Sequence, residues 1–349
     1  MNKEIIVRGH SSLNEKDCRV IAEAGVNHNN SVDRAIEMVR AAHASGAWAV
    51  KFQLYKTEEL VIRESPKYWS DDLGTSTQFQ AFKKSDKLSY SEYREIAEEC
   101  SKLGIIFFAT PFDQSAVQAL EDIEVPLYKV ASGDITYRRL LESIGETQKP
   151  VLLSTGASTR REIHQAIEWL GGDSSKICVL ACTLTYPTPD VDGNFARIPE
   201  FKKEFKDFLI GFSDHTIGDA GGWMTAALGG SCIEKHFTLD KTLGEVPDHV
   251  MSVDPLELTS LVKACNRATI LRGSSDIDVS TSERPALLNA RRSVVSVKPI
   301  SAGTMITSDM LTAKRPGIGI SAAELDHVVG RIARVDIKED AVVFSEDLI

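Results

Sequence analysis

The sequence lacks a long hydrophobic run, and its first apolar stretch, Ile5 to Val7, is followed at once by Arg8. A membrane-spanning helix needs about 20 predominantly apolar residues. A secretory signal peptide also needs a longer apolar segment than this one. We therefore expect a cytoplasmic protein with no membrane partner.

An excess of positive charge is missing as well. The chain has 40 Lys and Arg against 50 Asp and Glu, which gives a net charge of −10 and an isoelectric point near 5.4. Nucleic-acid-binding domains usually carry a basic patch, so this balance argues against a nucleic-acid partner. It still allows an anionic small substrate, because a few local lysines can bind phosphate inside an acidic protein.

Several common catalytic motifs are absent from the sequence. None of the six cysteines forms a C-x-x-C pair, which argues against a zinc ribbon or a thioredoxin-type site. Neither a G-x-G-x-x-G nucleotide loop nor a P-loop occurs. The Ser154-Thr155-Gly156 turn lacks the flanking residues of a nucleophile elbow. Cys178 and Cys182 lie in an apolar, strand-like run and are predicted to be small buried thiols.

What the sequence does contain is an alternation of short apolar runs and longer amphipathic stretches. The stretch 31–45, for example, has apolar residues at helical spacing, among them Val32, Ile36 and Val39. Eight strand-like runs connected in this way predict an α/β fold, a (β/α)8 barrel of the TIM type. The predicted strands cover residues 20–25, 49–53, 105–110, 128–132, 151–155, 177–183, 209–213 and 232–237.

The composition changes toward the C-terminus. A barrel domain is predicted over 1–272, followed by a Ser-, Asp- and Gly-rich linker over 273–290. In 291–349 short β-prone runs alternate with turn signals such as Pro316-Gly317. We expect a small, β-rich second domain there, and at this size it should dock on another surface. Its predicted strands cover 293–297, 328–335 and 341–344.

One connection in the barrel domain is unusually long. Residues 54–88 separate the second predicted strand from the next predicted helix and include Tyr55, Tyr68 and Trp69. Long connections inside compact domains are uncommon unless they have a function. This segment is predicted to be an active-site lid.

Polar side chains end each of the predicted strands. Barrel enzymes carry their chemistry at the C-terminal ends of the strands. Lys51 and Lys129 each allow two interpretations, a structural ion pair or an oxyanion-binding role. Together, and among hydroxyl groups, they favour recognition of a phosphate or carboxylate. The polar strand-end residues are Glu23, Lys51, Gln53, Thr110, Lys129, Ser132, Ser154, Thr155, Thr183, Tyr186, Ser213, Asp214, His215, Glu234 and His236.

Two histidines, His215 and His236, end neighbouring predicted strands. Imidazole is a ligand for Mn²⁺, Fe²⁺, Co²⁺ and Zn²⁺, and no cysteine thiolate is obvious nearby, which disfavours structural zinc. Two imidazoles leave the remaining metal positions open to water, substrate or Glu23. The pair therefore predicts an open divalent metal site suited to Lewis-acid catalysis.

Short motifs around these strand ends follow one another along nearly the whole chain. In this order they resemble the bacterial sialic acid (N-acetylneuraminate) synthases and their legionaminic and pseudaminic acid relatives. The motifs are AEAGVNH at 22–28, VKFQ at 50–53, ATPF at 109–112, YKVASG at 128–133, LSTG at 153–156, CT at 182–183, YPTP at 186–189, GFSDHT at 211–216, IEKHFT at 233–238 and KRPG at 314–317.

The resemblance implies a reaction and an architecture. The reaction joins phosphoenolpyruvate to an N-acetylated amino sugar and water, giving a nine-carbon 2-keto-3-deoxy sugar acid and phosphate. The architecture is a barrel followed by an antifreeze-like (SAF) domain that is exchanged across a homodimer. In such a dimer Arg315 would reach the substrate sugar in the neighbouring subunit.

The resemblance also implies roles for individual residues. His215 and His236 would bind the metal, with Mn²⁺ expected and Mg²⁺ or Co²⁺ as alternatives. Glu23 and Asp248 are candidates to orient sugar hydroxyls and to move protons. Gln53 and Tyr186 would complete the sugar contacts. The implied phosphoenolpyruvate contacts are Lys51, Thr110, Lys129, Ser132, Ser154 and Ser213.

The exact sugar stays open at this point. Both N-acetylmannosamine and a 2,4-diacetamido-6-deoxy hexose fit the resemblance, with the motifs at 22–25 and 247–249 closer to the legionaminic and neuraminic branches. Leu184 stands where the family often has Asn, and Asp134 varies in type among subfamilies. Two alternatives are a synthase of seven- or eight-carbon 2-keto-3-deoxy acids that uses another aldose, and a non-catalytic sugar-binding scaffold.

Overall fold

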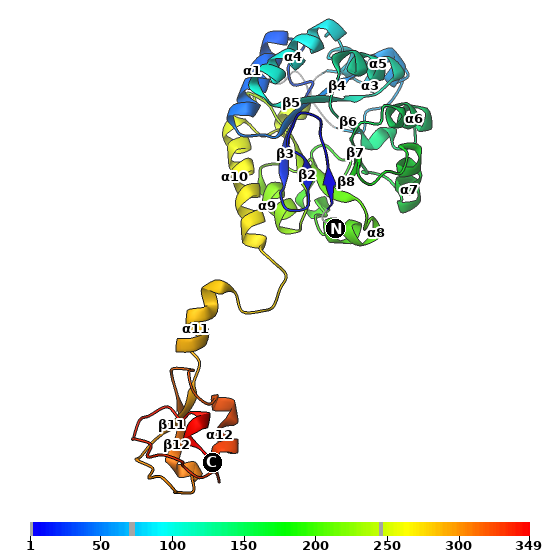
Figure 1. Cartoon of the computed structure of the whole chain (residues 1–349). Helices are drawn as coiled ribbons and strands as arrows, with labels where there is room; N and C mark the ends of the chain where they lie inside the picture. The colour runs from blue at the N-terminus through cyan, green and yellow to red at the C-terminus, as the bar shows by residue number, and fades with distance from the viewer. Residues whose placement is uncertain (1–2, 70–73, 244–246) are drawn as a thin grey trace. The chain divides into compact units, whose positions relative to one another are not determined.

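The computed structural model describes residues 3–69, 74–243 and 247–349. It divides into two compact units, Met1–Gly273 and Ser274–Ile349, which we describe separately (Figure 1). Among the described residues, no helix is both long and apolar enough to cross a membrane.

The first unit contains a parallel sheet of eight strands in the order β5-β4-β3-β10-β9-β8-β7-β6. The strands at its two ends, β5 and β6, are consecutive in the chain and in contact, so the sheet is a nearly closed barrel. The predicted (β/α)8 fold is confirmed. The strands are β3 (Arg19–Gly25), β4 (Ala49–Leu54), β5 (Ile106–Pro111), β6 (Tyr128–Val130), β7 (Val151–Ser154), β8 (Ile177–Cys182), β9 (Leu209–Asp214) and β10 (Cys232–His236).

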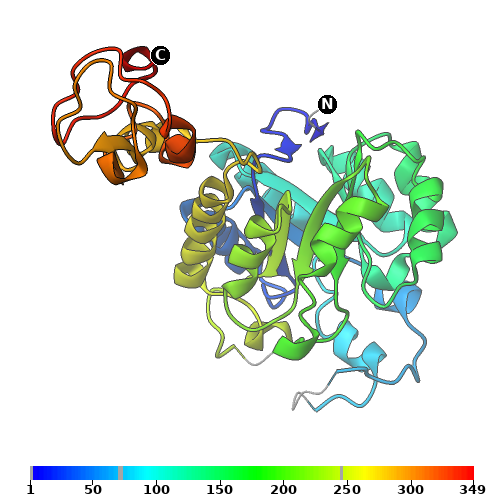
Figure 2. The same cartoon turned by 90° about the horizontal axis from the view of Figure 1, so that it is seen from below.

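Helices cover the outside of the strands (Figures 1 and 2). Several begin where the sequence supplies an N-cap: Ser89 and Thr159 each form a capping box with the glutamate three residues later. The helices that follow the strands are α1 (Val32–Ala44), α4 (Tyr90–Leu103), α5 (Gln114–Ile123), α6 (Arg138–Glu146), α7 (Arg160–Trp169), α8 (Arg197–Glu204), α9 (Ala220–Ala227) and α10 (Pro255–Arg272).

The long connection between β4 and α4 has some regular structure of its own. It contains two short helices, α2 (Thr57–Leu60) and α3 (Gln78–Lys83), and an isolated bridge between Pro66 and Thr77. Part of the predicted lid, residues 70–73, lies outside the described residues.

The barrel interior has two halves. Side chains in a strand alternate between its faces, so residues two apart point to the same side. Near the N-terminal ends of the strands the inward residues are apolar and fully packed. A hairpin of β1 (Glu4–Ile5) and β2 (Leu13–Asn14), which the sequence analysis did not predict, seals this half. The sealed half consists of Ile5, Val7, Leu13, Ile21, Ala49, Ile106, Phe108, Leu127, Leu152, Cys178, Leu180, Leu209 and Cys232.

Toward the C-terminal ends of most of the strands, the inward side chains are polar. Ser154 follows Leu152 on β7, for example, and Glu234 follows Cys232 on β10. The alternate residues of the same strands point outward and pack against the helices. The fold thus places a polar layer directly above a sealed apolar layer.

The second unit has an antiparallel pair, β11 (Ser293–Ser296) and β12 (Leu311–Lys314), and two short helices, α11 (Arg284–Asn289) and α12 (Leu325–Val328). The strands expected over 328–335 and 341–344 appear as isolated bridges instead of ladders. Gly330 (φ +88°) has a left-handed backbone inside the first of these ranges, which interrupts an extended strand, and Asp340 (φ +56°) has one immediately before the second. The unit has its own core around Val294, Ile306 and Val343.

Candidate functional site

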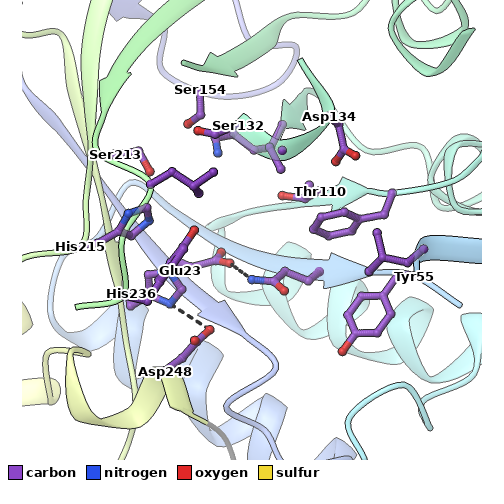
Figure 3. A pocket seen from close by; sticks show the side chains of 18 of the residues that line it. Glu23, Tyr55, Thr110, Ser132, Asp134, Ser154, Ser213, His215, His236 and Asp248 are labelled. Carbon is purple, nitrogen blue, oxygen red and sulfur yellow. Dashed lines mark hydrogen bonds and ion pairs between the residues drawn. The ribbon is translucent and has the colours of Figure 1, made fainter. Parts of the chain in front are cut away.

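A cavity of about 400 Å³ lies in the polar half of the barrel (Figure 3). All the predicted site residues of the first unit line it. They are Glu23, Lys51, Gln53, Thr110, Lys129, Ser132, Ser154, Tyr186, Ser213, His215, His236 and Asp248. The remaining predicted residue, Arg315, belongs to the second unit, where it is exposed after β12.

Lys51 lies at the centre of the cavity floor. Its Nζ donates to Thr110 Oγ1 at 3.0 Å and is paired with Glu23 Oε2 at 3.0 Å and Glu234 Oε1 at 3.6 Å. On its other oxygen, Glu23 accepts a hydrogen bond from Gln53 Nε2 at 2.8 Å. These groups come from three neighbouring strands and from β10, so the closed barrel is what brings them together.

Glu234 joins the two predicted anion-binding lysines. Its Oε1 lies 3.3 Å from Lys129 Nζ and accepts a hydrogen bond from Ser213 Oγ at 3.2 Å, in addition to the contact with Lys51. The sequence analysis placed Glu234 at a strand end but assigned it no role. Its role could have been inferred from the sequence, because two lysines that are buried in one barrel need an anionic partner.

Burial shapes the ionisation of this floor. Burial lowers the pKa of Lys129, because Glu234 compensates the loss of water only in part. Burial also opposes the charge on Lys51, but Glu23 and Glu234 outweigh it and raise the pKa of that lysine. Burial raises the pKa of Glu23, while the two lysines lower that of Glu234 against the effect of burial. A bound anion would supply the compensation that Lys129 lacks.

Hydroxyl groups surround the lysines. Ser154 Oγ is buried and has no hydrogen-bond partner among the described residues, so it is available to a ligand. Ser132 Oγ accepts from the backbone N–H of Gly156 at 2.9 Å. A Cβ at Gly156 would lie only 2.9 Å from Leu184 Cβ and 3.0 Å from Ser132 Oγ, so this approach requires glycine. The floor therefore offers two ammonium groups and several hydroxyls to one anion.

The two imidazoles lie side by side, with ring centroids 5.4 Å apart. His215 Nδ1 is 2.9 Å from the carbonyl oxygen of Thr183, to which its N–H can donate. That bond leaves Nε2 with its lone pair, as metal-binding histidines usually have it. His236 Nδ1 is buried without a hydrogen bond and lies 3.4 Å from Asp248 Oδ2 (Figure 3). Burial lowers the pKa of His236, which keeps it neutral.

These features fit a divalent metal held by two nitrogen ligands. No cluster of three or more His, Cys, Asp or Glu suited to a metal occurs among the described residues, so water and substrate would have to complete the coordination. Cys182, predicted to be an ordinary buried thiol, has its Sγ 3.8 Å from His215 Nδ1. That nitrogen already faces the Thr183 carbonyl, so the contact does not add a ligand.

Two further carboxylates, Asp248 and Asp134, line the cavity, and neither forms an ion pair with a lysine or arginine among the described residues. Burial raises the pKa of Asp248 to about 6, with a further contribution from Glu23. Asp248 is held in place through Ser252, whose hydroxyl donates to its backbone oxygen at 2.6 Å and accepts from Asn27 Nδ2 at 3.0 Å. Burial raises the pKa of Asp134 to about 7, and its Oδ2 has no hydrogen-bond partner among the described residues.

Comparison with known proteins identifies the family. The model of the NeuB family matches residues 38–276, and the model of the SAF domain matches residues 291–349. The chain belongs to the NeuB family. The resemblance that the motifs predicted is thereby confirmed. The reaction known for this family joins phosphoenolpyruvate to an amino sugar, and its synthases make nonulosonic acids.

Relatives match the NeuB-family chain over almost its whole length. An uncharacterised protein of Methanocaldococcus jannaschii is 39% identical over 331 residues, covering 95% of this chain and 94% of that protein. The N,N'-diacetyllegionaminic acid synthase of Legionella pneumophila is 36% identical over 339 residues, covering 95% and 94%. The structure of N-acetylneuraminic acid synthetase from Leptospira borgpetersenii superposes with a TM-score of 0.73 at 31% identity, covering 82% of this chain and 96% of that one.

A buried ion pair supports the site of this NeuB-family protein from the outer face of the barrel. Lys235 is fully buried; its Nζ lies 3.0 Å from Asp214 Oδ2 and also donates to the carbonyl of Thr216. Asp214 directly precedes His215 in the chain, and Lys235 directly precedes His236. A Cβ at Gly221 would lie 2.2 Å from Asp214 Oδ2, so α9 needs glycine there. The sequence analysis did not single out Lys235.

Proposed function

We propose that this chain is a nonulosonic acid synthase that condenses phosphoenolpyruvate and water with an N-acetylated amino sugar. The products would be a nine-carbon 2-keto-3-deoxy sugar acid and phosphate. The observation that carries the proposal is the convergence of two lysines and two neighbouring imidazoles on one cavity. An enol phosphate and an aldehyde need these two kinds of group together.

Phosphoenolpyruvate would bind on the floor of the cavity. Lys51 and Lys129 would neutralise its phosphate and carboxylate, and the unpartnered hydroxyl of Ser154 would donate to a remaining oxygen. The other proposed contacts are Thr110, Ser132 and Ser213.

A divalent metal would be held by His215 and His236, and Mn²⁺ is the ion we propose. When bound, it would supply Lewis-acid polarisation of the aldehyde oxygen of the sugar. The hydrogen bond from His215 to the Thr183 carbonyl and the position of Asp248 beside His236 support this assignment.

The residues of the chain would position the substrates and move two protons. The C2–C3 double bond of phosphoenolpyruvate supplies the electron pair for the new bond between C3 and the aldehyde carbon. Water then adds at C2, and phosphate leaves with the electrons of the C2–O bond. Both protons of the attacking water leave its oxygen as the C2 ketone forms: one goes to the former aldehyde oxygen and the other to the departing phosphate, and Glu23 and Asp248 are the proposed carriers. Gln53 and Tyr186 would orient the sugar.

Three further assignments belong to the proposal. The SAF domain, 291–349, would be exchanged across a homodimer, with 273–290 as its linker. Arg315 would then reach the sugar in the partner's cavity. We also propose that the protein acts in the cytoplasm.

The direct test is phosphate release from phosphoenolpyruvate with a panel of amino sugars. We expect release with at least one N-acetylated sugar, its loss in chelator and its return with Mn²⁺. The variant His236→Ala should remain folded, with an unfolding transition like that of the wild type. In a titration without substrate it should bind Mn²⁺ much more weakly. The proposed activity would be refuted by turnover only with the aldose substrates of seven- or eight-carbon 2-keto-3-deoxy acid synthases. It would also be refuted by no turnover with any sugar. Full turnover in chelator would refute the metal assignment.

A further inference from the structure

A turn that contains two asparagines follows the first barrel strand, β3. Asn29 (φ +48°) and Asn30 (φ +58°) both have left-handed backbones, a conformation that asparagine tolerates better than most residues. The turn is closed by its own backbone: the N–H groups of Asn29 and Ser31 donate to the carbonyls of Val26 and His28 at 3.0 Å. Neither asparagine lines the cavity, so both are free to act on it only through other residues.

Asn29 connects the turn to the segment that carries Asp248. Its Oδ1 lies 3.2 Å from Nε2 of His249, and Nδ1 of that imidazole lies 2.8 Å from Thr238 Oγ1. A neutral His249 satisfies both contacts when Nε2 donates to Asn29 and Nδ1 accepts from the Thr238 hydroxyl. His249 is 1% exposed and directly follows Asp248 in the 3₁₀ helix η3 (Pro247–Val250). Asn29 therefore fixes η3, and with it the position of the Asp248 carboxylate.

Asn30 connects the same turn to the long connection between β4 and α4. Its Nδ2 donates to the carbonyl of Lys84 at 2.7 Å, and its Oδ1 accepts from the backbone N–H of Lys87 at 3.1 Å. Between these two contacts, Asp86 accepts hydrogen bonds from the backbone N–H and the hydroxyl of Thr57, which begins α2. The two ends of the connection are thus fixed at one place. Several aromatic side chains of this connection line the cavity.

The two asparagines contact elements that carry groups proposed for the sugar. Asp248 belongs to η3, and Glu23 lies near the end of β3, just before the turn. The proposed phosphoenolpyruvate contacts lie instead on β4, β5, β6, β7 and β9 or directly after β6. Among the described residues, no hydrogen bond of the two asparagine side chains reaches one of these contacts. A change in the turn should therefore move the sugar contacts and leave the phosphate site in place.

We infer that Asn29 and Asn30 are positioning residues for the sugar substrate. They hold Asp248 and the aromatic side chains of the long connection at a fixed place relative to Glu23, and neither touches a substrate. The inference rests on the proposed function and adds to it the residues that set the geometry of the sugar contacts. Such geometry matters because a displacement of about 1 Å can reduce a rate about 100-fold.

Replacement by glycine removes each side chain without straining the backbone, because glycine adopts left-handed conformations freely. The assay is phosphate release with the most active sugar of the panel. For Asn29→Gly we expect kcat/KM for the sugar to fall about tenfold, while KM for phosphoenolpyruvate and the affinity for Mn²⁺ stay within about twofold of wild type. Asn30→Gly should have the same selective effect.

The matched control is Glu124→Gly. Glu124 (φ +62°) is exposed, has the same left-handed backbone and ends α5, which leads to the N-terminal end of β6. Its replacement should leave both kinetic constants and the affinity for Mn²⁺ unchanged. An equal loss of sugar kcat/KM in Glu124→Gly would show that any glycine in a left-handed turn has this effect, and would overturn the inference.

Two replacements of His249 separate positioning from packing. In His249→Gln the amide nitrogen can take the place of Nε2 and donate to Asn29, whereas the shorter side chain of His249→Asn does not reach it. We expect a kcat/KM for the sugar near that of wild type in the first variant and near that of Asn29→Gly in the second. Equal losses in both would show that His249 acts by packing alone.

Hydrogen exchange of the substrate-free protein gives a readout that does not depend on activity. Asn29→Gly should speed amide exchange in a peptide that covers 247–253 and not in one that covers 84–90, and Asn30→Gly should do the reverse. Unchanged exchange in both peptides, or an equal loss of affinity for phosphoenolpyruvate and for the sugar, would overturn this inference and leave the synthase activity standing. No turnover of any sugar by the wild type would overturn the proposed function, and the exchange pattern would still decide whether the asparagines hold these two segments.

Discussion

The sealed and the open halves of the barrel interior are separated, on several strands, by a single inward-facing position. On β7, Leu152 points into the apolar half and Ser154 into the cavity; on β10 the same step leads from Cys232 to Glu234. The backbone, the direction of the side chains and the burial are nearly the same. Only the chemistry of the side chains changes, from groups that gain free energy by burial to groups that lose it.

This difference separates stability from function within one structure. The apolar half should stabilise the fold, and the polar half should contribute activity at some cost in stability. Each of the following predictions tests that division, beginning with the largest effect.

Replacing Lys129 with Met should abolish most of the activity without unfolding the protein. We expect kcat/KM for phosphoenolpyruvate to fall about 10³-fold, because one of two cations facing the anion is lost. The free energy of unfolding without substrate should stay within about 1 kcal/mol of wild type or rise, since a buried charge is removed and Glu234 keeps its contacts with Lys51 and Ser213. Steady-state kinetics and urea unfolding measure both. A large decrease in the free energy of unfolding would show instead that Lys129 stabilises the fold.

Replacing Lys235 with Met should have the opposite result. This lysine is as deeply buried as Lys129, but it lies outside the cavity, and its removal leaves Asp214 buried without a cation. We expect a loss of about 3–5 kcal/mol in urea unfolding. The control is Lys203→Met, which removes an exposed pair with Glu200 and should cost at most about 1 kcal/mol. Similar small losses in both variants would contradict this account of the pair.

Leu152→Ala tests the sealed half directly. Deleting this fully buried side chain should lower the free energy of unfolding by about 2–5 kcal/mol. The kcat/KM of the remaining folded enzyme should change little, although Leu152 lies only two residues from Ser154. Leu256→Ala, on the exposed face of α10, is the matched control and should be nearly neutral in both measurements. If Leu152→Ala reduces kcat/KM as strongly as Lys129→Met, the two halves are not separable.

The same division explains what the sequence could predict. Strands that are buried on both faces appear as continuous apolar runs, so all eight strands of the barrel could be found. Polar residues that end such runs have no role in a core, so it could be predicted that Lys51, His215 and His236 lie together, and all three line the cavity. The short hairpin β1–β2 was missed because two-residue strands carry no periodic signal.

Other features depend on which strands become neighbours and therefore could not be predicted. Glu234 acquires its role only when the closed barrel brings Lys51 and Lys129 to the same carboxylate. Lys235 follows Glu234 in the strand and therefore points to the outer face, where a lysine would usually be exposed to solvent. Helices cover the outer face of β10, however, so Lys235 is buried. The rings of Tyr55 and Phe82 likewise line the cavity together with those of Phe112 and Tyr186, and no sequence pattern connects these residues.

The smallest expected effect concerns pH and the carboxylate of Asp134. The pKa of Asp134 is raised by burial to about 7, from an ordinary value of 3.8. Between these values the folded protein binds a proton that the unfolded chain does not, so this residue makes the protein less stable as the pH rises. Relative to Asp134→Asn, the wild type should lose about 1–2 kcal/mol of unfolding free energy between pH 5 and pH 8, after allowance for the partial exposure of the side chain. Urea unfolding of both proteins at the two pH values measures this difference. Parallel pH profiles would show that the polar half accommodates the Asp134 charge without cost, and the contrast between the halves would then be limited to the lysines and glutamates of the floor.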